Sequence, residues 1–341
     1  MTRIAFFDTK PYDKVWFDQL SGDHTVQITY FESKLNERTA ALAKGYEVVC
    51  AFVNDTITKA VIDELYDGGV RLLAMRCAGY NNIDFKAAFA KIHIVRVPAY
   101  SPYAVAEHAM ALLLSVVRQT HHSYVRTREF NFSLNGLVGF DLHGKTIGVV
   151  GTGKIGKVFI DICKGFGMKV LAYDPYPDPN LSVTYCTFEE LCRQSDIISL
   201  HCPLTEQTFH LINRTSIALM KDQVVLINTS RGALVESQAL LDGIKSKKIG
   251  AAALDVYEEE AEVFYEDRST TILDDDVLML LISMPNVLVT SHQAFLTKEA
   301  LHNIAQTTLG SIDSFVSGQV MEHEICYQCD TCKKVIGQRC F

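Results

Sequence analysis

Short apolar runs alternate with amphipathic stretches along most of the chain, and this alternation gives the first expectation about the fold. In the N-terminal part we expect strands at Ile4–Phe7, Val26–Tyr30, Val48–Val53, Leu72–Met75 and Ile92–Val97. Strands that alternate regularly with helices form a parallel sheet with helices on its faces. This part of the sequence therefore predicts one complete α/β domain.

A second series of apolar runs begins near residue 146. Its expected strands are Thr146–Val150, Lys169–Tyr173, Ile197–Leu200, Val224–Asn228, Gly250–Leu254 and Val287–Thr290. Together they predict a second doubly wound parallel sheet. At 341 residues the chain exceeds the size at which one hydrophobic core usually stops growing, so we expect two domains.

Two expected helices flank this second series. Ser101 and Pro102 open the first, with Ser as the N-cap and Pro in the first turn, and the sequence that follows is apolar nearly all round. Such a helix must be covered on every side, either by its own domain or by a partner subunit. The other helix, Thr297–Val316, is amphipathic and follows the last expected strand, so it can return to pack on the N-terminal domain.

These elements predict one domain at residues 1–99 and 297–330, with the second domain, residues 100–296, inserted between its two parts. The chain would cross between the domains near Val97–Tyr100 and His292–Leu296. We expect these crossings to form a hinge beside an interdomain cleft. Residues 326–341 form a cysteine-rich tail.

The segment Lys145–Asp174 places a GxGxxG turn between an apolar run and a helix. Gly151 permits the tight turn, Gly153 lets the backbone approach a pyrophosphate, and Gly156 lets strand and helix pack closely. The helix N-terminus offers unpaired N–H groups to the phosphates. Asp174, 18 residues after Gly156, can accept hydrogen bonds from ribose hydroxyls and repels a 2′-phosphate. We therefore expect a Rossmann domain that binds NAD rather than NADP, inserted into a flavodoxin-like substrate domain.

Composition narrows the classes of partner. The net charge of −8 disfavours a broad surface for nucleic acid or anionic lipid. No run approaches about 18 consecutive apolar residues, and the N-terminus lacks the long apolar core of a secretory signal. We expect a cytoplasmic protein whose partner is a small molecule, with no nucleic-acid or membrane partner.

The ten cysteines fall into two groups. Six lie in apolar segments and are expected to be reduced and buried: Cys50, Cys77, Cys163, Cys186, Cys192 and Cys202. The other four crowd the C-terminus: Cys326, Cys329, Cys332 and Cys340. A bound zinc ion, an iron–sulfur cluster and a frayed extension with redox-sensitive thiols are the alternatives there. Irregular spacing and the terminal position weaken the metal interpretation, so no metal ligand is included in the expected site.

Three polar residues stand at or just beyond the ends of expected strands, where ligands bind in open α/β sheets. Arg231 follows the run VVLIN, Glu260 follows AAAL, and His292 follows NVLVT. A guanidinium can hold a carboxylate through two parallel hydrogen bonds, and an imidazole beside a carboxylate suits proton transfer near neutral pH. Glu258 and Glu259 are alternative partners for the imidazole, and a histidine after a strand is often only a capping residue.

The segments RCAGYNNID, VPAYSPYAVAEHA, GKTIGVVGTGKIG, LHCPLT, NTSRGALV, LDVYEEE and VLVTSHQAFLT form a highly specific combination. With them the chain resembles the D-specific 2-hydroxyacid dehydrogenases, most closely the fermentative D-lactate dehydrogenases of bacteria, from residue 1 to about residue 320. The resemblance implies catalysis by Arg231, Glu260 and His292. In it, His292 would give a proton to the keto oxygen of pyruvate as NADH delivers hydride, Glu260 would keep the imidazole protonated, and Arg231 would bind the carboxylate.

The same resemblance implies further contacts. Backbone N–H groups around Ala78 and Gly79 would hold the substrate carboxylate, which Tyr100 would also contact, and Phe295 would pack on a short substrate side chain. The remaining implied cofactor contacts are Lys154 and Ile155 at the pyrophosphate, Cys202 and Pro203 beside the adenosine, Thr229 near the nicotinamide riboside and Asp255 at the carboxamide. Relatives of this kind are commonly dimers or tetramers.

The leading interpretation is reversible, NADH-dependent reduction of pyruvate to D-lactate. One alternative within the class is a dehydrogenase of another D-2-hydroxyacid. The alternative from a different class is a dinucleotide-sensing regulatory protein of the same fold, because a fold does not by itself fix a function.

Overall fold

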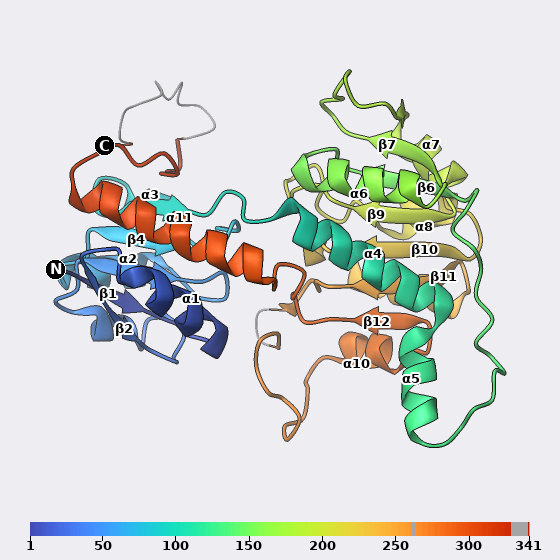
Figure 1. Cartoon of the computed structure of the whole chain (residues 1–341), viewed down its shortest axis with the longest axis horizontal. Helices are drawn as coiled ribbons and strands as arrows, with labels where there is room; N and C mark the ends of the chain where they lie inside the picture. Colours follow the sequence, from blue (N-terminus) through green and yellow to red (C-terminus); the bar gives the residue numbers. More distant parts are fainter. Residues whose placement is uncertain (261–262, 329–339, 341) are drawn as a thin grey trace. The chain divides into compact units, whose positions relative to one another are not determined.

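The computed structural model describes residues 1–260, 263–328 and 340. The chain divides into two compact units, Met1–Ser101 with Leu296–Phe341, and Pro102–Phe295. Each unit has its own parallel β-sheet with helices packed against it (Figure 1). The expected fold class, two parallel-sheet α/β domains, is confirmed.

The first unit contains a five-stranded parallel sheet. In spatial order its strands are β2 (Val26–Tyr30), β1 (Thr2–Phe6), β3 (Val48–Ala51), β4 (Leu72–Met75) and β5 (His93–Arg96). This 2-1-3-4-5 order is that of flavodoxin-like folds. A C-terminal segment continues the sheet beyond β5, because the N–H of Ile325 donates to the carbonyl of Ile94 at 2.9 Å and the N–H of Arg96 donates to that of His323 at 3.2 Å.

Helices cover this sheet. They are α1 (Pro11–Ser21), α2 (Lys59–Asp67), the short α3 (Phe85–Ala88) and α11 (Lys298–Val316), with a 3-10 turn at Ala40–Ala43. From α11, Ala305, Leu309 and Ile312 pack in one core with Phe6 and other strand residues. The C-terminal helix therefore completes the core that the N-terminal strands begin, as its amphipathic pattern predicts.

The second unit contains a seven-stranded parallel sheet. In spatial order its strands are β12 (Val287–Val289), β11 (Ile249–Leu254), β10 (Val224–Asn228), β9 (Ile197–Leu200), β6 (Thr146–Val150), β7 (Lys169–Tyr173) and β8 (Thr184–Tyr185). Numbered from β6, the first six strands follow the 3-2-1-4-5-6 order of a Rossmann fold.

Both faces of this sheet are covered, which explains why its strands are continuous apolar runs. Successive side chains of a strand point to opposite faces. Ile197 accordingly belongs to the core beneath α4 (Pro102–Arg118) and α6 (Lys154–Gly165), whereas Ile198 belongs to the core on the other face. The helices of that second face are α7 (Phe188–Gln194), α8 (Arg214–Leu219), α9 (Ser237–Lys245) and α10 (Asp276–Ser283).

Helix α4 lies alongside α6 over the sheet (Figure 1). Nine of its residues, including Leu112 and Leu113, are buried, whereas Tyr103 and Glu107 are exposed. The helix that is apolar nearly all round is thus covered largely within its own unit. Of the two possibilities that its sequence allows, its own domain rather than a partner subunit provides most of the cover.

Several exposed apolar side chains follow one another on the segment after α4. Helix α5 (Thr120–Arg128) has no buried residue, and Figure 1 shows it and the loop after it as a projection from the sheet. Phe130 is 85% exposed, Phe132 71%, Leu134 78% and Val138 89%. We call residues 120–140 the apolar arm.

The expected strands agree with the observed ones to within one or two residues, and two details differ. Strand β8 has no apolar run and was not expected, because it is only a two-residue edge strand paired with β7. Cys186 is partly exposed rather than buried because it follows this edge strand, and the other five cysteines of its group are buried. In the tail, Cys326 and Cys340 are partly exposed, and Cys329 and Cys332 lie outside the described residues.

Two glycines of α6 offer a matched test of the packing between strand and helix. A Cβ on Gly156 would lie 2.0 Å from the carbonyl oxygen of Gly151, whereas a Cβ on Gly165 would meet nothing within 4 Å. We expect Gly156→Ala to lower the free energy of unfolding by about 1–3 kcal/mol or more through overpacking. Gly165→Ala should raise it by up to about 1 kcal/mol, because alanine favours helix. Equal denaturation midpoints for the two variants would contradict this account.

Candidate active site and dinucleotide site

The GxGxxG turn joins β6 to α6 at the carboxyl edge of the second sheet. Gly151 has φ +95°, and a Cβ there would lie 2.7 Å from the backbone N of Cys202, so the turn requires glycine. A Cβ on Gly153 would meet nothing within 4 Å, which leaves open space in front of the turn. Gly153 is the N-cap of α6 and provides no side-chain cap, so the first N–H groups of the helix remain for an anion.

Asp174 lies just after β7, beside this turn. Its Oδ2 accepts hydrogen bonds from the N–H of Thr152 at 2.7 Å and from Thr152 Oγ1 at 3.0 Å, and its Oδ1 accepts one from the N–H of Tyr176 at 2.9 Å. These donors fix the carboxylate at the end of the strand. A carboxylate at this position can accept hydrogen bonds from the hydroxyls of an adenosine ribose.

The other expected cofactor residues lie around the same edge of the sheet. Thr229 directly follows β10, and its Oγ1 is buried with no hydrogen-bond partner among the described residues, as expected of an atom that awaits a ligand. Burial raises the pKa of the Cys202 thiol to about 11, so this side chain is neutral beside the turn. Lys154 and Pro203 are exposed, and Ile155 is partly buried.

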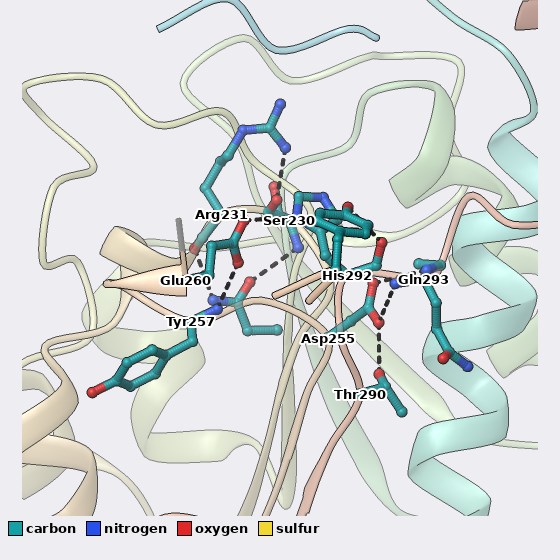
Figure 2. A network of polar contacts seen from close by, with 11 residues as sticks. Ser230, Arg231, Asp255, Tyr257, Glu260, Thr290, His292 and Gln293 are labelled. Carbon is teal, nitrogen blue, oxygen red and sulfur yellow. Dashed lines mark hydrogen bonds and ion pairs between the residues drawn. The ribbon is translucent and has the colours of Figure 1, made fainter. Parts of the chain in front are cut away.

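His292 and Glu260 form a close pair (Figure 2). His292 Nδ1 lies 2.7 Å from Glu260 Oε1, and Glu260 Oε2 accepts a hydrogen bond of 2.9 Å from the N–H of Tyr257. Both side chains are less than a fifth exposed, with relative accessibilities of 17% for His292 and 18% for Glu260. The carboxylate thus orients the imidazole.

The neighbouring glutamates have other surroundings. Glu258 contacts His210 Nε2 at 2.5 Å and accepts a hydrogen bond of 3.0 Å from Ser237 Oγ. Burial alone would raise the pKa of Glu258, but the bonds from His210 and Ser237 outweigh it and lower the pKa below its usual value. Glu259 is exposed. Of the three glutamates, Glu260 is therefore the one that contacts His292.

The backbone of His292 is held in an uncommon conformation, with φ 52°. Its N–H donates to the carbonyl of Asp255 at 2.7 Å, and its carbonyl accepts a hydrogen bond of 2.9 Å from Tyr265 Oη. The carboxylate of Asp255 accepts bonds from Thr290 Oγ1 at 2.6 Å and from the N–H groups of Gln293 at 2.9 Å and Ala294 at 2.8 Å (Figure 2). Asp255 thus fixes the loop that carries the imidazole. Its contact with a nicotinamide carboxamide stays a prediction.

Arg231 follows β10 by three residues. Its carbonyl accepts a hydrogen bond of 2.8 Å from Asn228 Nδ2, and its Nη1 donates to the carbonyl of Ser230 at 2.7 Å. The next residue, Gly232, packs against the second loop, because a Cβ there would lie 1.9 Å from the carbonyl oxygen of Tyr257. The loop of Arg231 therefore abuts the loop that leads to Glu260. The guanidinium retains donors for an anion.

The expected substrate residues belong to both units. Ala78 and Gly79 are partly buried just beyond β4 in the first unit, where the carbonyl of Tyr100 accepts a hydrogen bond of 2.7 Å from Asn303 Nδ2. Phe295 is buried at the end of the second unit, with 8% of its surface exposed. Their contacts with a substrate stay predictions.

Three residues that support His292 were missed by sequence reasoning: His108, Tyr265 and Thr290. His108 Nε2 lies 3.2 Å from Thr290 Oγ1 and 3.3 Å from Asp255 Oδ1. No linear spacing relates α4 to the loop after β12, so no signal along the chain indicated this contact. The sequence indicates only that Asp255, an acid directly after a buried strand, needs a polar or charged partner from another segment.

The described residues contain no group of histidine, cysteine, aspartate or glutamate side chains suited to a metal ion. Nor do the described helices include one with the length and hydropathy needed to cross a bilayer.

A Rossmann sheet, a glycine-rich turn before an uncapped helix, and an imidazole–carboxylate pair at the same sheet edge define a nicotinamide-dependent oxidoreductase. The family model described as "D-isomer specific 2-hydroxyacid dehydrogenase, NAD binding domain" matches residues 110–294. The chain belongs to the D-isomer specific 2-hydroxyacid dehydrogenase family, and its cofactor is NAD.

Relatives over nearly the full length agree with this assignment. The chain is 47% identical to the D-lactate dehydrogenase of Escherichia coli (strain K12) over 327 residues, which is 95% of this chain and 99% of the relative. The apo structure of an Escherichia coli D-lactate dehydrogenase has a TM-score of 0.88 at 45% identity, covering 95% of this chain and 100% of that one. A structure described as the pyruvate reductase of Chlamydomonas reinhardtii has a TM-score of 0.90 at 43% identity, covering 94% and 98%.

The contacts of Asp174 lead to a test of cofactor choice. We expect Asp174→Ala to weaken NADH binding by about tenfold or more, the effect of losing a hydrogen-bonding carboxylate, and to narrow the preference for NADH over NADPH. Fluorescence titration with both dinucleotides measures this. Asp178→Ala is the control, because Asp178 pairs with Lys157 at 2.5 Å on the same edge of the unit. An unchanged NADH to NADPH affinity ratio in Asp174→Ala would refute the role of Asp174.

Proposed function

We propose that this enzyme reduces pyruvate to D-lactate with NADH, reversibly. The observation that carries the proposal is the 2.7 Å contact between His292 Nδ1 and Glu260 Oε1, on a loop that abuts the loop of Arg231 in the NAD-binding unit. The names of the relatives, D-lactate dehydrogenase and pyruvate reductase, support pyruvate as the substrate.

The proton passes through His292 in this proposal. Because Nδ1 faces Glu260, Nε2 is the ring nitrogen that gives its proton to the keto oxygen in reduction and takes it back in oxidation. The carboxylate of Glu260 stabilises the charged imidazolium and holds the ring in one orientation. NADH, when bound, supplies the hydride to the carbonyl carbon, so that one hydride and one proton convert the ketone to an alcohol.

Arg231 binds the substrate carboxylate in this proposal. A guanidinium offers two parallel N–H donors that match the two oxygens of a carboxylate, a geometry that lysine cannot provide. Its contact with the carbonyl of Ser230 uses one donor, and the others are enough for a bidentate pair. The positive charge also polarises the adjacent carbonyl group toward hydride attack.

In this proposal Tyr100 contacts the substrate carboxylate and Phe295 packs on the substrate side chain, which favours a methyl or another small group. Another D-2-hydroxyacid dehydrogenase activity is the alternative within the family. A regulatory protein of the same fold would require neither the His292–Glu260 pair nor an arginine on the abutting loop, so these residues favour an enzyme.

Replacement of His292 tests the proton transfer. We expect His292→Gln to lower kcat for pyruvate reduction by about 10²- to 10⁴-fold, the usual contribution of general acid–base catalysis, with NADH binding retained. Loss of NADH absorbance measures turnover. His24→Gln is the control, because His24 Nδ1 contacts a carboxylate oxygen of Asp313 at 2.5 Å in the other unit. Wild-type protein that binds NADH without reducing pyruvate would end the proposal.

We further propose that the protein is a cytoplasmic homo-oligomer that associates through the apolar arm. Monomers rarely expose several large apolar side chains on one segment, and Phe130, Phe132, Leu134 and Val138 are each more than two-thirds exposed. A second copy is the occupant that gives every arm the same surroundings, because a two-fold interface uses one patch twice.

A double substitution in the arm tests this association. We expect Phe130→Asp with Phe132→Asp to raise the concentration at which the oligomer dissociates by about tenfold or more, because charges replace buried aromatic anchors. Light scattering after size exclusion measures the mass. Ile272→Asp is the control, since Ile272 is 96% exposed in the same unit but outside the arm. A wild-type protein that is monomeric at all concentrations would show that the arm has another role.

A further inference from the structure

We propose that Arg96 is a positioning residue for the substrate carboxylate, acting through the backbone of residues 77–79. The inference rests on the proposed function, in which the N–H groups of Ala78 and Gly79 bind that carboxylate. Arg96 is the last residue of β5, the strand next to β4 in the sheet of the first unit. Its Nη1 donates to the carbonyl of Ala78 at 3.0 Å.

This hydrogen bond decides where one N–H group points. In a trans peptide the carbonyl of one residue and the N–H of the next point in opposite directions, and the described chain has no cis peptide bond. Because the carbonyl of Ala78 points to the guanidinium of Arg96, the N–H of Gly79 points away from it. Arg96 therefore aims one of the two expected carboxylate donors.

The second donor is aimed by the backbone of the same strand extension. The N–H of Val97, the residue after Arg96, donates to the carbonyl of Cys77 at 3.2 Å, so the N–H of Ala78 also points away from β5. Neither the N–H of Ala78 nor that of Gly79 donates to another group in the part of the chain that the structure describes. Two adjacent N–H groups without partners form a small anion-binding concavity.

The guanidinium itself is fixed by the carbonyl of Ala78 and by the ring of Tyr80. Its central carbon lies 4.9 Å from the centre of the Tyr80 ring, which packs edge-on against Phe85 with 5.5 Å between ring centres. The backbone of Arg96 is held at the sheet edge by the bond from its N–H to the carbonyl of His323. A positive charge held behind the peptide of Ala78 also strengthens the attraction of that concavity for an anion.

Arg96 thus stabilises a bound carboxylate without touching it, and it acts alike on every 2-oxoacid, whatever the side chain. We expect Arg96→Gln to raise KM for pyruvate by about tenfold, the effect of losing one oriented hydrogen bond to a charged group. We expect kcat and the dissociation constant of NADH to change by less than about twofold, because the hydride and proton donors stay in place. The KM of Arg96→Lys should lie between those of the wild type and Arg96→Gln, since lysine keeps the charge and loses the planar fork.

Arg3→Gln is the matched control. Arg3 lies on β1 of the same sheet, its Nη1 donates to the carbonyl of Gly45 at 3.3 Å, and its guanidinium lies 4.5 Å from the Tyr46 ring centre. It therefore makes the same two kinds of contact away from residues 77–79, and its loss should leave KM unchanged. A general loss of stability would affect both variants alike, whereas positioning of the carboxylate is specific to Arg96.

The experiment compares steady-state kinetics of the whole enzyme with pyruvate and a longer 2-oxoacid, and inhibition by oxamate, a carboxylate that resembles pyruvate. Equal loss of affinity for all three compounds in Arg96→Gln supports the proposal. If that variant does not fold, Tyr80→Leu removes the ring beneath the guanidinium and should raise KM by about two- to fivefold.

An active wild type with unchanged KM and oxamate inhibition in Arg96→Gln, or in Tyr80→Leu where that variant replaces it, would overturn the role of Arg96 alone. A wild type that binds NADH but reduces no 2-oxoacid would overturn the proposed function, and this inference with it.

Discussion

The buried carboxylate of Asp255 is the constraint on which the loop of His292 depends. An ionised carboxylate without exposure to water is costly unless hydrogen bonds replace its hydration. Here Thr290, Gln293 and Ala294 supply those bonds, and His108 lies within ion-pair distance. The loop must therefore wrap around the end of β11.

Wrapping the loop in this way places His292 in the left-handed region, which costs a side-chain-bearing residue on the order of 1–3 kcal/mol. Such a conformation persists only where the surroundings determine it, and hydrogen bonds at both the N–H and the carbonyl of His292 do so. The imidazole then meets Glu260 with little freedom to rotate away. A strained backbone at this position is thus part of what holds the imidazole against Glu260.

The doubly wound sheet explains how residues so distant in sequence meet. All strands of a parallel sheet end at one edge, so the segments after β6, β7, β10 and β11 carry the glycine turn, Asp174, Arg231 and Asp255 to the same side. In the first unit the equivalent edge carries the loop after β4, where the guanidinium of Arg96 donates to the carbonyl of Ala78. Family membership fixes the nicotinamide chemistry, while the acid that is reduced depends on what these loops hold.

The sequence alone determined the observed strands other than β8, because a strand buried on both faces must be a continuous apolar run, as Val224–Asn228 is. It also determined the dinucleotide turn, since glycine at residues 151 and 156 is required by close backbone contacts that no other residue allows. It could not determine which of three consecutive glutamates faces His292, nor that His108 lies behind Asp255, nor that Arg96 orients the peptide of Ala78. Those choices depend on distances between loops of different strands, and only the packed tertiary structure sets such distances.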